Sequence, residues 1–276
     1  MLQDAGMQPN NVLDFIRHRD VDDELPPYWT HNHIETPEGF SVTSVAEQLR
    51  GVISVCVQMN SVVLVMGRPG LGKTIAARWI ASSDPYHAIY MMVSKTQGTL
   101  SGYMKLLADS AGWYTDRESS SGLWCIAKNR LPEEAGRGRY LIVDDAQNLE
   151  PDAMIELVGF RERANIPIIL IGNLDTLSRK KAGLEYDRLS DRIWTNNLKS
   201  PDNRDFDLLG SHYNLDGKET YSLLARYGHR TSMRQADRLL QIAKTLAASR
   251  GRIGKETLEE AISYLHSASS NKFFKA

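Results

Sequence analysis

A glycine-rich turn at residues 67–74, with the sequence GRPGLGKT, constrains the fold of this chain more than any other stretch. It follows an apolar run at 62–66 and precedes an apolar-periodic segment at 75–81. A buried strand, a glycine-rich turn and a helix that opens on Lys73 and Thr74 are the context in which G-x-x-x-x-G-K-[ST] predicts a P-loop. An ordinary strand–turn–helix connection is the alternative. The flanking elements favour the P-loop, and hence a nucleoside triphosphate site.

A P-loop binds phosphate largely through its backbone. Its glycines let successive amide groups point into a concave nest, and the positive end of the following helix adds to the attraction. We expect Lys73 to reach the β- and γ-phosphates of ATP and the Thr74 hydroxyl to ligate Mg²⁺. The residues expected to contact the nucleotide here are Gly67, Pro69, Gly70, Leu71, Gly72, Lys73, Thr74 and Ile75.

Composition places the chain among globular proteins with a large core. It has 276 residues, of which 42% are hydrophobic and 24% are charged. No apolar run approaches the ~18–20 residues that would span a bilayer, and the N-terminus lacks the pattern of a signal peptide. Cys56 and Cys125 have no ligand-like spacing, so we expect two reduced cysteines in a cytoplasmic protein with no membrane partner.

A net charge of −1 conceals two oppositely charged regions. Residues 1–40 contain eight acidic residues against two arginines, whereas residues 225–255 contain eight basic residues against Asp237 alone. The basic region predicts either a face for nucleic acid or a solvated helix surface, and both interpretations stay open. Residues 1–40 hold too little apolar surface for a core, so we expect an acidic arm that serves as a docking segment or linker.

Strand and helix patterns alternate through the first two hundred residues. Ser44 and Glu47 have the spacing of a capping box, and residues 112–122 are typical of an exposed connection. The expected strands are 62–66, 88–93, 140–143, 166–171 and 193–198, and the expected helices are 44–59, 75–81, 99–111, 123–131 and 152–163. Such alternation predicts a parallel sheet in a three-layer α/β domain.

The pattern changes near residue 200, after which no strand is expected. Helices are predicted near 203–213, 218–227, 232–249 and 255–266. We therefore divide the chain into an N-terminal acidic arm at 1–40, an α/β nucleotide-binding domain at 41–200, and a small helical lid with a short tail at 201–276.

A second nucleotide motif follows the strand at 140–143, which ends in Asp144 and Asp145. In a Walker B motif Asp144 would hold Mg²⁺, commonly through water, and Asp145 would act as the general base on the attacking water. A turn with an N-cap is the alternative. Asn173 ends the strand at 166–171, and would touch the γ-phosphate or the water if that strand lies beside the P-loop strand. Alone, it is also an ordinary turn residue.

Together these motifs resemble those of the AAA+ ATPases: a P-loop, a Walker B acid pair, a strand ending in Asn, and arginines before the last strand and in the lid. More narrowly, residues 141–149 (LIVDDAQNL) and 168–173 (IILIGN) resemble the MuB-like ATPases of DNA transposition, which include TnsC and IstB. The resemblance covers about residues 60–265. It does not extend to residues 1–40, where the helix-turn-helix domain of MuB has no counterpart.

The resemblance implies roles for two arginines. Arg192, with Arg188 as the second choice, matches the arginine finger that completes a neighbouring subunit's site by stabilising charge on the transferring phosphoryl group. A surface salt bridge is the alternative. Arg234, two residues after Ser232 at the start of an apolar helix, matches the sensor II position and would reach the γ-phosphate from the lid. A solvated arginine is its alternative.

One position departs from the superfamily, because Asp145 stands where Glu is usual. The side chain is one methylene shorter, and a displacement of a catalytic group by ~1 Å can cost on the order of 10²-fold in rate. Replication initiators of the DnaA type also have two aspartates here. We therefore expect slow ATP hydrolysis, with ATP acting as a switch for assembly.

The resemblance further implies ATP-driven oligomerisation, as a filament or ring, on duplex DNA of any sequence, and an encounter with a transposase. Non-specific binding needs lysines, arginines and polar residues along the phosphates. An arginine finger that acts in trans requires head-to-tail contacts. The expected DNA contacts are Lys95, Thr96, Lys105, Thr115 and Arg117, each of which is otherwise a plain surface residue. Trp113 is expected in the core.

Two other functions remain open. A replication initiator or helicase loader of the same superfamily would bind a specific origin or a replicative helicase. A small-molecule P-loop kinase would need an acceptor pocket and would turn over as a monomer, and the basic lid and paired arginines disfavour it.

Overall fold

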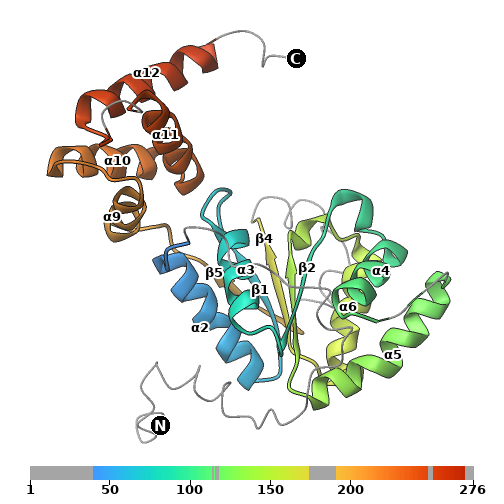
Figure 1. Cartoon of the computed structure of the whole chain (residues 1–276). Coiled ribbons are helices and arrows are strands. Elements are labelled where there is room, and N and C mark those ends of the chain that lie inside the picture. The colour runs from blue at the N-terminus through green and yellow to red at the C-terminus, as the bar shows by residue number, and fades with distance from the viewer. Residues whose placement is uncertain (1–39, 114, 116–117, 174–190, 248–250, 271–276) are drawn as a thin grey trace, which may run out of the picture.

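A computed structural model of the chain describes residues 40–113, 115, 118–173, 191–247 and 251–270. An α/β body and a separate group of helices make up these residues (Figure 1). The predicted fold class, a three-layer α/β domain followed by an all-helical lid, is confirmed. No helix in the described part combines the length and apolar character needed to cross a membrane.

Five parallel strands form the central sheet in the order β2-β3-β4-β1-β5. They are β1 (Val62–Met66), β2 (Ala88–Met92), β3 (Tyr140–Asp144), β4 (Ile168–Gly172) and β5 (Ile193–Asn197). Because the strands are parallel, the residues that follow β1, β3 and β4 emerge at one edge of the sheet. This carboxyl edge brings together the P-loop, the Walker B acids and Asn173. β4 lies beside β1, as the proposed role of Asn173 requires.

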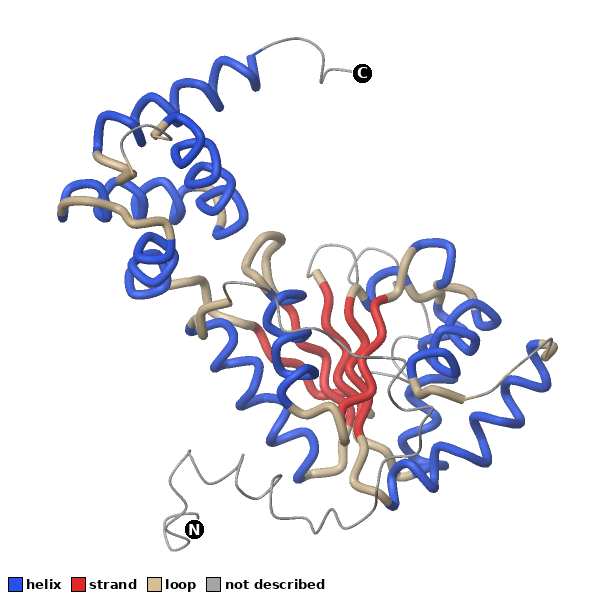
Figure 2. Tube along the Cα trace, in the orientation of Figure 1, coloured by secondary structure: helices blue, strands red, loops and turns tan. Residues whose placement is uncertain are grey.

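Helices cover both faces of the sheet (Figure 2). One face packs on α2 (Ser44–Gln58) and α3 (Lys73–Ser83), and the other on α4 (Leu100–Ser110), α5 (Ser120–Gly136) and α6 (Pro151–Ala164). Strand side chains alternate between the two layers: Val63 points to the α2–α3 side, and Leu64 to the other. A sheet covered on both faces explains why its strands are nearly all apolar.

Two local predictions were wrong. Thr43, not Ser44, caps α2, because the Thr43 hydroxyl accepts from the amide of Ala46. The helix predicted at 123–131 is α5, which begins at Ser120 and continues past Pro132 to Gly136. A proline inside a helix removes one backbone hydrogen bond and crowds the preceding turn, which favours an end near Leu131, but α5 continues through Pro132. The predicted connection at 112–122 is accordingly shorter, and its Trp113 lies in the core.

The lid consists of α9 (Asn203–His212), α10 (Lys218–Arg230), α11 (Met233–Leu246) and α12 (Lys255–Ser270). These helices share an apolar core of their own, which includes Phe206, Leu224 and Leu240. The close approach of α9 and α10 depends on Gly228, where a β-carbon would lie 2.0 Å from the Phe206 ring.

One carboxylate ties the lid to the α/β body. The buried Asp205 of α9 accepts hydrogen bonds from the backbone amide and the hydroxyl of Ser44, both at 2.6 Å. It also accepts from the amide of Asp202 at 2.9 Å. The hydroxyl that would have completed the predicted capping box therefore joins the first turn of α2 to the first turn of α9.

Candidate nucleotide site

The loop between β1 and α3 has the backbone shape of a phosphate nest. Gly70 and Gly72 adopt φ angles of 80° and 94°, which residues with side chains rarely take. Gly72 directly precedes Lys73, the first residue of α3. The loop therefore places the amino end of a helix, with its free amide groups, at the carboxyl edge of the sheet.

Lys73 is held at the centre of this edge. Its ammonium group donates to the carbonyl oxygens of Gly67 (2.8 Å) and Arg68 (3.0 Å) and to Oδ1 of Asn173 (2.9 Å). Burial lowers the pKa of Lys73, whereas the charges of Asp144 and Asp145 oppose that shift. The structure thus brings together the P-loop lysine, the acid pair and the asparagine, which lie far apart in the sequence.

Asp144 is buried among hydroxyl groups. It accepts from the Tyr90 hydroxyl at 3.1 Å and from the amide of Asp145 at 2.9 Å. Burial raises the pKa of the Asp144 carboxyl, and a hydrogen bond from the Thr74 side chain counters this shift. A carboxylate beside a threonine hydroxyl is a pair of hard oxygen donors of the kind that Mg²⁺ prefers. The two residues predicted to hold the metal therefore fit it.

Asp145 has an unusual backbone and a defined partner. Its φ of 53° lies in the left-handed region, at the turn that leads into the short 3₁₀ helix η3 (Ala146–Asn148). The side-chain Nε2 of Gln147 donates to Oδ1 of Asp145 at 2.8 Å. The side-chain Oε1 of Gln147 accepts from the backbone amide of Asn173 at 3.3 Å. Gln147 therefore links the predicted general base to the end of β4.

The lid meets the P-loop through the start of α11. The backbone amide of Arg234 donates to the carbonyl of Gly70 at 3.2 Å. A β-carbon at Gly70 would lie 2.8 Å from the Ser232 hydroxyl, so the absence of a side chain permits this approach. The Arg234 charge is near enough to lower the pKa of Lys73. The predicted sensor II residue thus lies at the phosphate loop.

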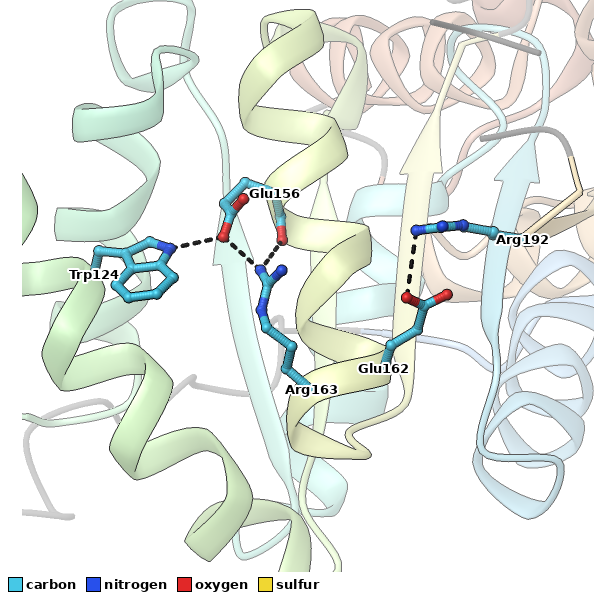
Figure 3. Close-up of polar contacts among 5 residues, drawn as sticks. All are labelled: Trp124, Glu156, Glu162, Arg163 and Arg192. Carbon is cyan, nitrogen blue, oxygen red and sulfur yellow. Dashed lines mark hydrogen bonds and ion pairs between the residues drawn. The ribbon is translucent and has the colours of Figure 1, made fainter. Parts of the chain in front are cut away.

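Arg192 lies at the opposite, amino edge of the sheet. The next residue, Ile193, pairs with Val62 at the start of β1, whereas the P-loop follows the end of that strand. Five residues of strand separate the two edges by roughly 16 Å. The guanidinium is half exposed, and its Nη1 lies 3.4 Å from Oε2 of Glu162 on α6 (Figure 3). Arg192 is thus placed away from the P-loop of its own chain, and Arg188 lies outside the described residues.

Three of the five predicted DNA contacts lie on the two elements that follow β2. Lys95 and Thr96 are exposed on the 3₁₀ helix η2 (Lys95–Gln97), and Lys105 is exposed on α4. Thr115 is partly buried, and Arg117 lies outside the described residues.

The η2 segment packs against the turn that follows the acid pair. The Asn148 side chain donates to the carbonyl of Val93 at 2.7 Å, and the Glu150 amide donates to the carbonyl of Gly98 at 2.8 Å. A β-carbon at Gly98 would lie only 1.9 Å from the Asn148 carbonyl oxygen. Lys95 and Thr96 therefore lie on a segment that contacts the loop carrying Gln147.

Sequence reasoning assigned no role to three residues at this edge: Tyr90, Gln147 and Ser232. Gln147 lies inside the Walker B run, but nothing in the pattern indicates which way its amide turns. Tyr90 is a polar aromatic residue in an otherwise apolar strand, which could have indicated a hydrogen-bonding partner at the strand end.

Comparison with known proteins agrees with this geometry. The family described as "AAA domain" matches residues 58–179. The Mu-like prophage FluMu DNA transposition protein B of Haemophilus influenzae is 26% identical over 188 residues, which cover 66% of this chain and 63% of that protein. The ATP-dependent target DNA activator B of Escherichia phage Mu is 23% identical over 275 residues, which cover 94% of this chain and 86% of that protein.

Solved structures share the fold. The Orc1 protein of Aeropyrum pernix, solved in complex with DNA, has a TM-score of 0.58 and 16% identity, with 86% of this chain and 68% of that chain covered. Orc2 of the same organism has a TM-score of 0.60 and 18% identity, and the match covers 86% of this chain and 71% of that chain. Cdc6p of Pyrobaculum aerophilum has a TM-score of 0.59 and 16% identity, and the match covers 80% of this chain and 66% of that chain. At these identities the likeness shows an AAA+ fold alone.

Proposed function

From its similarity to the B transposition proteins of Mu-like phages, we propose that this chain is an ATP-dependent activator of target DNA in transposition. In this proposal its ATP-bound form assembles head to tail on duplex DNA of any sequence and recruits or activates a transposase. The observation that carries the proposal is the meeting of Lys73, Asp144 and Asn173 at one sheet edge, in a chain that aligns with the phage Mu activator over 94% of its length.

The residues of the carboxyl edge divide the work of hydrolysis. Lys73 binds the terminal phosphates, and Asn173, already hydrogen-bonded to Lys73, orients the attacking water or the γ-phosphate. Asp145 accepts the proton of that water. The Thr74 hydroxyl and the Asp144 carboxylate would hold Mg²⁺, which neutralises phosphate charge when it is bound. Arg234 approaches the same phosphates from the lid.

Arg192 acts on the neighbouring subunit. Because it lies at the amino edge, a head-to-tail contact is needed to bring its guanidinium to a P-loop. Its pair with the half-exposed Glu162 is weak enough to be exchanged for a phosphate. Hydrolysis in this scheme depends on assembly, which fits a switch better than a monomeric enzyme.

DNA acts on hydrolysis through η2. Lys95, Thr96, Lys105, Thr115 and Arg117 are the proposed backbone contacts. The packing of Gly98 on the Asn148 carbonyl joins η2 to the loop in which Gln147 holds Asp145. A shift of η2 on DNA would therefore be transmitted to the general base. The contact between η2 and the Gln147 loop, together with the short Asp145 side chain, supports slow hydrolysis that DNA can regulate.

A replication initiator or helicase loader is the second candidate, and the likeness to the Orc and Cdc6 structures favours it on fold alone. The two functions differ in their DNA. A target activator protects any duplex, whereas an initiator protects one sequence.

An ATPase assay with titrated protein and random-sequence duplex tests the proposal, together with nuclease protection in ATP and in ADP. We expect a rate per protomer that rises with protein concentration and with DNA, protection of any sequence in ATP, and release in ADP. A rate independent of both would indicate a monomeric kinase instead, and protection of one sequence would indicate an initiator.

A pair of variants tests the DNA surface. In Lys95→Ala/Lys105→Ala the slope of log affinity against log salt concentration should fall by roughly 2, since each lysine that contacts a phosphate contributes about 1. The matched control, Arg130→Ala, removes an exposed cation of α5 and should leave the slope unchanged. Equal slopes in the parent, the double variant and the control would show that DNA does not contact Lys95 and Lys105.

A further inference from the structure

A basic groove runs between α9 and α10 on the lid. It has a volume of about 1120 Å³. We call it the lid groove and define it by Arg204 and Leu208 of α9 and Lys218, Tyr221, Arg226 and Arg230 of α10. Lys218, Arg226 and Arg230 share one face of α10, because they are separated by multiples of four residues.

The charge of the lid groove is not neutralised by the lid itself. Arg204, Lys218, Arg226 and Arg230 are all exposed, and none of them is in an ion pair with another residue that the structure describes. Asp207 is the one acidic residue among the lining side chains. Four cations gathered around one concavity raise the local concentration of anions, so the lid groove fits an anionic partner.

The apolar part of the groove narrows the choice of partner. Leu208 and Tyr221 line it as partly buried side chains between the two helices. A duplex presents phosphates on a rigid cylinder and has no side chain to insert between two packed helices. An extended acidic peptide with apolar side chains satisfies both features, because its carboxylates meet the cations while its apolar residues cover Leu208 and Tyr221.

The chain itself contains such a peptide. Residues 20–38 include six acidic residues, together with Leu25, Tyr28 and Trp29, and no lysine or arginine. We propose that residues 20–38 of this protein bind in the lid groove of the same chain. The inference does not depend on the proposed function.

The contact between α2 and the lid shortens the distance that residues 20–38 must span to the lid groove. The N-terminal segment leads into α2, whose first residue, Ser44, is hydrogen-bonded to Asp205. Asp205 lies next to Arg204 in α9, so the chain enters the fold beside one end of the lid groove. A segment tethered this closely has an effective concentration of the order of millimolar at its site, which favours binding within one chain over binding between chains.

Zero-length carbodiimide cross-linking of the full-length protein tests the proposal, because it joins a lysine amine only to a carboxylate in direct contact. We expect mass spectrometry to find Lys218 joined to an acidic residue of the 20–38 segment, in the monomer fraction and at low protein concentration. Lys218→Arg, which keeps the charge but removes the amine, should lose this product.

Two charge reversals separate the lid groove from the general charge of the lid. Arg226→Glu should lower the cross-link yield roughly three- to tenfold, since it places a like charge against the segment. The matched control, Arg252→Glu, reverses an exposed cation outside the lid groove and should change the yield less than about twofold. Thermal melts of both variants establish that they fold.

Four outcomes would overturn the inference. One is a segment that cross-links to lysines outside the groove as readily as to Lys218. A second is a yield that Arg226→Glu leaves unchanged. The third is a product found only between two chains. If Arg226→Glu weakened duplex binding while the cross-link persisted, the lid groove would bind nucleic acid and the proposal would be wrong.

Discussion

The two edges of the sheet are built in opposite ways. At the carboxyl edge, Lys73 has three hydrogen-bond acceptors within 3.0 Å, and Asp144 is 1% exposed. At the amino edge, Arg192 is half exposed, and its one ion pair among the described residues is with the equally exposed Glu162, at 3.4 Å.

This is the difference expected if Lys73 and Asp144 act on ATP in their own chain and Arg192 acts on ATP in a neighbouring chain. A residue that must meet ATP in its own chain gains from being fixed before binding, because no ordering is then needed during the reaction. A residue that acts on ATP in a neighbouring chain must be able to leave its ion-pair partner in its own chain. Variants at the two edges test this contrast, and we expect the largest effect at Arg192.

Removing the guanidinium at the amino edge should have the largest effect on turnover. We expect Arg192→Ala to lower the assembled rate of ATP hydrolysis by about 10³-fold or more, the usual magnitude for an arginine finger. ATP binding by dilute protein should be unchanged, because Arg192 lies at the edge remote from its own P-loop. Steady-state kinetics and nucleotide titration measure the two quantities.

Mixing two inactive variants sharpens this test. A protomer with Lys73→Ala still offers its arginine, and one with Arg192→Ala still offers its P-loop. If Arg192 acts in trans, an equimolar mixture should recover part of the parent rate. Recovery of no activity, or a parent-like rate in Arg192→Ala alone, would mean that Arg192 is only a surface ion pair.

Removing the ammonium at the carboxyl edge should give the second effect. Lys73→Ala is expected to lower the rate by about 10²–10³-fold, as the loss of one preorganised charge on a transferring group does. It should also weaken ATP binding in dilute protein, which distinguishes it from Arg192→Ala. Lys199→Ala, an exposed lysine beyond β5, serves as the control. Retained ATP binding in Lys73→Ala would contradict the P-loop assignment.

Loss of the link between Asp145 and β4 should have a smaller effect. Gln147→Ala leaves Asp145 without its 2.8 Å partner, so we expect kcat to fall roughly tenfold with KM nearly unchanged. The stimulation by DNA should fall with it. Gln147→Asn is too short to reach both partners and should behave like Ala. Equal effects on kcat and KM would indicate a disturbed loop rather than a mispositioned base.

Neutralising the partner of Arg192 should have the smallest effect. Glu162→Gln removes an exposed ion pair, which is worth about 1 kcal/mol or less. We expect a change in Tm of no more than a few degrees and an assembled rate that is equal to or slightly above the parent rate. A large loss of activity would show that Glu162 positions Arg192, and the contrast between the edges would then be too simple.

The fold could be predicted because its determinants are local. Apolar strands, a P-loop and alternating helices indicate a parallel sheet, and the carboxyl ends of such strands must meet. The side-chain partners of Gln147 and Ser44 could not be predicted. The reach of Gln147 to Asn173 depends on a left-handed turn at Asp145, a conformation that no residue type requires. The Ser44–Asp205 contact joins positions 161 apart in sequence, and a capping pattern misled the interpretation.

The Asp205 carboxylate also determines how the lid can move. Its bonds to Ser44 lie at the first turns of both helices, so a lid that swings keeps this point as a pivot while more distant parts sweep through an arc. Arg234, at the start of α11, lies on such an arc above Gly70. A small rotation about this buried acid would therefore carry the Arg234 amide away from the Gly70 carbonyl and open the contact between the lid and the P-loop.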